Sequence, residues 1–132
     1  MLKKFKMDSC KPIGALMECK MKLSKFDKAE KVDVTNFKSL VGSLQYLTCT
    51  RLDILYVTGL ISRYMETQTI THLKATKGIL LYIKGSIIFG LWFLTSNDYK
   101  LVGYSDNNWA GDKNDRKSTS EFVLFMGNTT FT

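Results

Sequence analysis

The spacing of hydrophobic residues changes character once along this chain. Between residues 35 and 85 the apolar side chains recur at helical intervals, and polar breaks at 51–53 and 67–71 divide the stretch into three parts. We therefore predict amphipathic helices over about 35–49, 53–66 and 71–85. Asp33 or Thr35 can cap the first helix, and Gly85 can end the third.

Beyond residue 87 the pattern becomes an alternation of apolar and polar residues. This period predicts strands over 88–94, 100–106, 119–126 and 129–132, with turns at 96–98 and 127–128 and a polar loop at 111–117. Short strands with tight connections favour an antiparallel meander. Because the helices precede the strands, the predicted fold class is α+β.

The first 31 residues show little periodicity and are interrupted by Pro12 and Gly14. We predict a poorly packed basic arm over 1–31, a helical segment over 32–87, and a β-segment over 88–132. The net charge of the whole chain is +7, and residues 1–31 hold nine lysines and only four acids. A basic segment attracts nucleic acid, although charge alone favours a solvated, flexible terminus.

Several classes of protein do not fit the sequence. No uninterrupted apolar stretch approaches the ~18 residues of a membrane span, so we expect no membrane association. The first ten residues have lysines but lack the apolar core and cleavage site of a signal peptide. We therefore expect an intracellular protein with reduced cysteines, in cytoplasm or nucleus. Cys10, Cys19 and Cys49 form no CxxC pair, which argues against a zinc site.

Asp106 is the most interesting acid in the chain. Side chains alternate along a strand, so Asp106 shares a face with Val102 and Tyr104 in the strand predicted over 100–106. A carboxylate on an apolar strand face is costly unless it is paired or binds a metal. The alternative is that the strand has already ended and Asp106 is a turn residue, and the residues alone favour this alternative.

For several other residues a structural role is an alternative to a functional one. Lys74, Lys77 and Lys84 share a sector of the third predicted helix and could face a phosphate backbone, although a solvated helix face is the commoner role. The sequence favours a capping or surface role for His72, at the start of that helix. Trp92 and Trp109 are more often core residues than base-stacking platforms.

Several short strings, in a fixed order, resemble copia-type retrotransposon Pol polyproteins. The resemblance covers nearly the whole chain and is specific because order and spacing agree together. The strings are KSLVGSL at 38–44, YLT at 46–48, TRLDI at 50–54, SRYM at 62–65, YIKGS at 82–86, VGYSD at 102–106, WAGD at 109–112 and RKSTS at 116–120.

This resemblance implies a place in a longer polyprotein that copies element RNA into DNA and degrades the RNA strand of the hybrid. Residues 1 to about 95 match the thumb and connection of the reverse transcriptase, and residues from about 100 match the first strands of RNase H. Asp106 then matches the first carboxylate of an active site that holds Mg²⁺. The palm aspartates and the other RNase H carboxylates have no match here, so we expect no stable Mg²⁺ binding and no catalysis by this chain alone.

The chain also departs from the family pattern. Leu52 stands in place of a proline, Gly78 and Leu81 in place of arginines, and Glu121 in place of a glycine. These changes suggest a decayed element copy. An alternative function is a small basic module that binds nucleic acid, such as RNA–DNA hybrid, weakly through its lysines, and a third is an interaction domain with no nucleic-acid role.

Overall fold

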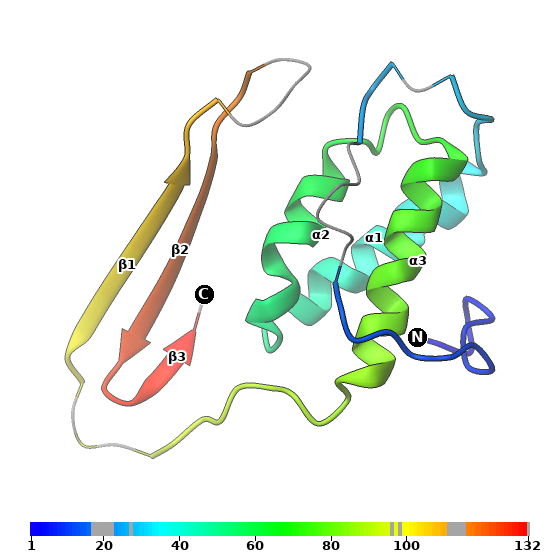
Figure 1. Cartoon of the computed structure of the whole chain (residues 1–132). Helices are drawn as coiled ribbons and strands as arrows, with labels where there is room; N and C mark the ends of the chain where they lie inside the picture. Colours follow the sequence, from blue (N-terminus) through cyan, green and yellow to red (C-terminus); the bar gives the residue numbers. More distant parts are fainter. Residues whose placement is uncertain (17–22, 27, 96, 98, 111–115, 132) are drawn as a thin grey trace.

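The computed structural model describes residues 1–16, 23–26, 28–95, 97, 99–110 and 116–131. Within these ranges three α-helices are followed by a three-stranded antiparallel sheet, which confirms the α+β prediction (Figure 1). The helices are α1 (Val34–Thr48), α2 (Leu55–Ser62), which a short 3₁₀ turn at Leu52–Ile54 precedes, and α3 (Ile70–Gly85). The strands are β1 (Leu101–Asn108), β2 (Thr119–Met126) and β3 (Thr129–Phe131).

Helices α1 and α3 begin at side chains that cap them. The Asp33 carboxylate accepts a hydrogen bond from the Thr35 backbone N–H at 2.9 Å, which satisfies one of the free donors of α1. At the start of α3, Nδ1 of His72 accepts a hydrogen bond from the Thr69 N–H at 3.1 Å, so the predicted capping role is confirmed. The His72 ring is nevertheless fully buried and stacks on Tyr64, with ring centroids 4.3 Å apart.

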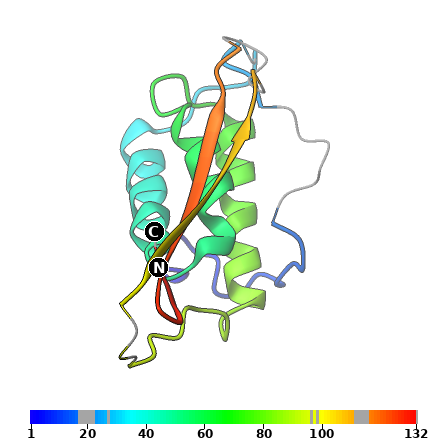
Figure 2. The ribbon, with the colours of Figure 1, turned by 90° about the vertical axis from the view of Figure 1, so that its left-hand side faces the viewer.

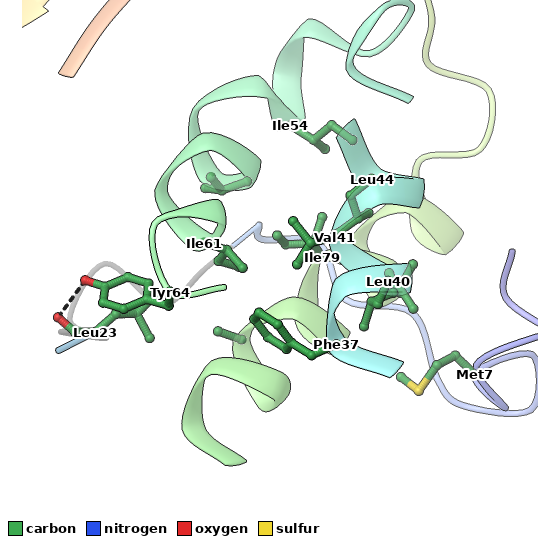
Figure 3. Close-up of a cluster of buried hydrophobic side chains, with 13 residues drawn as sticks. Met7, Leu23, Phe37, Leu40, Val41, Leu44, Ile54, Ile61, Tyr64 and Ile79 are labelled. Carbon is green, nitrogen blue, oxygen red and sulfur yellow. Dashed lines mark hydrogen bonds between the residues drawn. The ribbon is translucent and has the colours of Figure 1, made fainter. Parts of the chain in front are cut away.

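The hydrophobic core lies among the three helices (Figure 3). Phe37 and Leu44 on α1, Ile61 on α2 and Ile79 on α3 are fully buried and represent its centre. Burying such side chains contributes about 1.5–3 kcal/mol each, which far exceeds the contribution of any surface contact. The apolar side chains that recur at helical spacing therefore stabilise this half of the molecule by packing against one another.

The N-terminal segment packs more closely than its composition suggests. Met7 and Leu23 are buried in the helical core, and the Tyr64 hydroxyl donates to the Leu23 carbonyl at 3.2 Å (Figure 3). The Ile13 N–H also donates to the Leu81 carbonyl on α3 at 3.3 Å. The described part of residues 1–31 is thus anchored at several points by single apolar residues, while most of its other side chains are exposed, as a poorly packed arm predicts.

The sheet is a continuous meander in the order β1-β2-β3. Leu101 pairs with Met126 and the register runs without a bulge to the pairing of Asn108 with Thr119. Gly127, at a φ of 58°, makes the tight turn between β2 and β3, a backbone conformation that glycine adopts without strain. The predicted strands over 100–106 and 119–126 and the turn at 127–128 are therefore confirmed, and the strand predicted over 129–132 is confirmed as far as Phe131, the last described residue.

One predicted strand is absent. Residues 88–94 form no strand, and the segment instead makes isolated contacts with both halves of the molecule. The Leu91 N–H donates to the Thr50 carbonyl at 3.2 Å, and the Leu94 N–H donates to Oγ1 of Thr129 at 3.3 Å. Alternation alone was misleading here because a strand also needs a neighbouring strand to accept its backbone hydrogen bonds. The predicted turn at 96–98 lies largely outside the described residues.

The sheet lies to one side of the helices (Figure 1) and passes in front of them when that side faces the viewer (Figure 2). Arg63, just after α2, donates through Nη2 to the Ser118 carbonyl at 3.3 Å and so links the helical half to the loop before β2. Trp92 and Trp109 are 84% and 85% exposed, so the prediction that they belong to the core was wrong. No helix formed by the described residues has the length and hydrophobicity to cross a membrane.

Candidate functional site

Asp106 lies within β1 and not in a turn. The strand continues through Asn108, so the interpretation of Asp106 as a turn residue was wrong. The register places Asp106 directly opposite Glu121 on β2, and the Asp106 side chain is exposed. One carboxylate oxygen, Oδ1, accepts a hydrogen bond from the Asn107 backbone N–H at 2.8 Å. The second oxygen keeps its acceptor capacity for a group outside the strand.

The donors near Asp106 do not fit a two-metal centre. Such a centre needs several carboxylates that converge on two ions about 4 Å apart. Glu121 is the carboxylate that the register brings opposite Asp106, and the described residues contain no group of three or more His, Cys, Asp or Glu side chains that could hold a metal ion. Asp112 and Asp115 lie outside the described residues. The part of the chain that the structure describes therefore lacks the donor set for two-metal hydrolysis.

The three lysines of α3 do not share one environment. Lys74 is exposed and Lys77, one turn further along the helix, is half-buried. Lys84 donates through Nζ to the carbonyls of Asp8 and Cys10, at 2.6 Å and 2.7 Å. The Lys84 ammonium therefore fastens the N-terminal segment to the end of α3, while Lys74 and Lys77 present the positive charge of the α3 surface. A nucleic-acid role for all three stays a prediction.

Sequence reasoning missed a densely hydrogen-bonded polar group among the described residues, which we call the Arg51 clasp. Arg51, 6% exposed, donates Nε and Nη2 to the two carboxylate oxygens of Asp53, at 2.9 Å and 2.7 Å. Its Nη1 and Nη2 also donate to the carbonyl and hydroxyl of Ser86, at 3.1 Å and 2.7 Å. The Tyr82 hydroxyl donates to Oδ2 of Asp53 at 2.9 Å. The clasp therefore joins the segment between α1 and α2 to the end of α3.

The electrostatics of the clasp favour its charged form. The hydrogen bond from Arg51 is the main reason why the pKa of the Asp53 carboxyl lies below its usual range. The same hydrogen bond raises the pKa of Arg51. Burial, and then the hydrogen bond to Asp53, raise the pKa of the Tyr82 hydroxyl. The guanidinium also lies 5.9 Å from the ring centroids of Tyr82 and Phe89, within cation–π range.

The sequence did carry a signal for the clasp. Arg51 and Asp53 lie in the TRLDI string, and Tyr82 and Ser86 open and close the YIKGS string. The hydrogen bonds between these two strings join residues about 30 positions apart. Resemblance marked both strings, but only the fold brings them together, and their role here is structural.

Curated proteins that are similar to this chain include Pol polyproteins of plant transposons. The chain is 38% identical over 127 residues to the retrovirus-related Pol polyprotein from transposon RE1 of Arabidopsis thaliana. It is 35% identical over 127 residues to the corresponding polyprotein from transposon RE2 of the same plant. Each alignment covers 96% of this chain and 9% of the relative. The chain belongs to the copia-type retrotransposon Pol polyproteins, of which it matches one segment.

An uncharacterized mitochondrial protein of Arabidopsis thaliana is 35% identical over 121 residues, which cover 92% of this chain and half of that protein. No protein-family model and no solved structure matches the chain. The chain spans less than a tenth of the length of the RE1 and RE2 polyproteins. The clasp and Asp106 are therefore features of a short segment of a Pol polyprotein.

Proposed function

We propose that this Pol segment comprises the thumb and connection of a reverse transcriptase, up to about residue 95, followed by the first strands of an RNase H domain. The observation that carries the proposal is the placement of Asp106 on β1 of an antiparallel sheet that follows the helices. The strings VGYSD and RKSTS fall on β1 and at the start of β2, in the order in which the family has them.

We propose further that the chain alone catalyses neither polymerisation nor hydrolysis. No string in it matches the metal-binding aspartates of a polymerase palm. Mg²⁺ binds weakly to one or two carboxylates and retains most of its water molecules there. Asp106 with Glu121 is therefore too small a donor set to activate a water molecule on a phosphodiester.

The test of catalysis uses a labelled RNA–DNA hybrid with Mg²⁺ or Mn²⁺. We expect no cleavage by the purified chain above that of an Asp106→Asn control, because both lack a converging carboxylate cluster. Cleavage by the parent chain that disappears in Asp106→Asn would overturn the assignment of inactivity and support the RNase H assignment. Cleavage that persists in the variant would point to a contaminating nuclease.

A second candidate function is weak, sequence-independent binding of nucleic acid such as RNA–DNA hybrid. It is favoured by the net charge of +7, by the lysines at the N-terminus, and by exposed Lys74 beside half-buried Lys77 on α3. Each phosphate contact releases counterions, so the logarithm of the affinity should fall linearly with the logarithm of the salt concentration.

The binding test compares substitutions of single lysines. Lys74→Gln should weaken binding to a labelled hybrid and reduce the salt slope by roughly one. Lys38→Gln removes the same charge from α1 and is the matched control, expected to change the slope less. Deleting residues 1–31 would remove Met7 and Leu23 from the core, so the N-terminal lysines are better replaced by glutamine. Affinity that does not change with salt would refute the electrostatic account.

A further inference from the structure

His72 is a titratable side chain that lies wholly inside the helical half. Its ring is 0% exposed and stacks on Tyr64, with ring centroids 4.3 Å apart and planes inclined by 17°. His72 is also the single histidine of the chain. Histidine is the side chain that ordinarily changes its charge between about pH 5 and 8. A change of side-chain charge in that range is therefore expected at a buried position, next to the start of α3.

The hydrogen bonding of the ring determines which nitrogen carries the proton. Nδ1 of His72 accepts a hydrogen bond from the Thr69 backbone N–H at 3.1 Å, so Nδ1 holds a lone pair and the ring proton lies on Nε2. The Thr69 hydroxyl oxygen lies 3.0 Å from the same Nδ1. A second proton, taken up from water, would add at Nδ1. There it would oppose the Thr69 N–H and break the bond that caps α3.

The capped residue, Thr69, also joins the start of α3 to the N-terminal segment. Lys31 pairs with Thr69 in an isolated antiparallel bridge. The next N–H along the chain, that of Ile70, donates to the Glu30 carbonyl at 2.9 Å. The Thr69 backbone is therefore held by the imidazole within the fold and in turn holds residues 30 and 31. Loss of the bond to Nδ1 would loosen both the first turn of α3 and this attachment.

The groups around the ring are better suited to its neutral form. The Tyr64 ring attracts a cation on its face, but it cannot replace the water that an imidazolium needs. The Tyr64 hydroxyl donates to the Leu23 carbonyl at 3.2 Å, and a phenol does not titrate between pH 5 and 8. Half-buried Arg63, beside Tyr64, directs Nη2 to the Ser118 carbonyl.

The other charged groups on the elements that pack around the ring are mostly at the surface. Among the described residues of 23–38 and 64–77, Lys25 and Lys77 are half-buried, and the exposed ones are Lys28, Glu30, Lys31, Asp33, Lys38, Glu66 and Lys74. Water screens exposed charges, so they act weakly on a buried ring. The two half-buried lysines carry the same sign as an imidazolium and would oppose its formation.

We propose that His72 is a pH-sensitive lock, which fastens the start of α3 to the N-terminal segment at neutral pH and destabilises the helical half in mildly acidic solution. The unfolded chain accepts a proton on its imidazole at the ordinary value of about 6.5. The folded chain accepts that proton only by giving up the bond from Thr69. Below about pH 6.5 the unfolded state therefore binds more protons than the folded state, and stability falls as the pH falls.

The test is urea unfolding of the chain between about pH 7.5 and 5, with His72→Gln as the matched variant. A glutamine at this third position of the helix can accept from the Thr69 N–H, as in a capping box, but it does not titrate. We expect the folding equilibrium constant of the parent chain to fall by up to about tenfold for each pH unit below about 6.5. That of His72→Gln should change much less. Both chains share the same carboxyl groups, so the comparison cancels their contribution.

The imidazole can also be followed directly, because a chain with one histidine gives one Cε1–H resonance in an NMR spectrum. This resonance should keep its neutral position in the folded chain until the helical circular dichroism signal is lost. Protonation with a midpoint of about 6.5 while the helices persist would overturn the proposal. An equal pH dependence of stability in the parent chain and His72→Gln would also overturn it. Should His72→Gln fail to fold, the resonance of the parent chain decides by itself.

Discussion

Removing the negative charge of the Arg51 clasp should strongly destabilise the helical half. An Asp→Asn substitution at an exposed position, which makes the same chemical change, should cost much less. In Asp53→Asn, the guanidinium of Arg51 stays buried and keeps its bonds to Ser86 but loses its counter-ion. Breaking a fully buried pair costs about 3–5 kcal/mol. The Asp53 side chain is 30% exposed, so water offsets part of that cost and we expect about 2–3 kcal/mol.

The measurement is urea unfolding followed by the helical circular dichroism signal. The loss should lower the midpoint by roughly 1–2 M, with the slope unchanged. Asp33→Asn is the matched control: the exchange is chemically identical, but asparagine caps a helix about as well as aspartate, so the midpoint should hardly move. Equal shifts for Asp53→Asn and Asp33→Asn would refute the idea that burial of Arg51 determines the cost.

Four further outcomes can be measured in the same assay. The lowered pKa of Asp53 stabilises the fold above its ordinary value of 3.8, and this contribution is lost as the pH falls through the folded pKa. The parent chain should therefore lose its advantage over Asp53→Asn below about pH 4; a constant difference would contradict this. Gly42→Ala and Gly78→Ala should each stabilise by up to about 1 kcal/mol, because an added Cβ meets no atom within 4 Å. Gly85→Ala should destabilise, since its Cβ would lie 3.1 Å from a backbone carbonyl of the N-terminal segment; equal effects at all three glycines would refute the steric argument. Phe37→Ala should cost about 3–5 kcal/mol, and a loss below 1 kcal/mol would show that the core is looser than described.

The sequence predicted the elements whose hydrogen bonds are local or whose faces are buried. The bounds predicted for the first and third helices agree with α1 and α3 within one residue. The segment 88–94 was mistaken for a strand because the identity of a strand depends on a neighbour distant in sequence. Asp106 was assigned to a turn for a related reason: its polarity suggested an end to β1, but pairing with β2 extends the strand to Asn108.

The candidate site was harder to predict than the fold. The clasp depends on Arg51 and Ser86, which are 35 residues apart. A local sequence pattern cannot predict a contact between residues so far apart in the chain. Lys84 shares a helix sector with Lys74 and Lys77, as its spacing predicts, yet its ammonium is occupied by carbonyls of the N-terminal segment. Periodicity gives the direction of a side chain, but the partner that meets it depends on the tertiary structure.

The buried hydrophobic side chains are distributed unequally between the two halves, and this affects how mutations accumulate in the gene segment. Every buried hydrophobic side chain in the described ranges lies at or before Leu80, and the sheet contributes none. A missense change in β1, β2 or β3 should therefore leave the packing of the helical core unchanged. Damage to the sheet would then accumulate with little effect on the solubility or proteolytic resistance of the helical half. Sequence drift in such element copies should then run faster after residue 100 than before it.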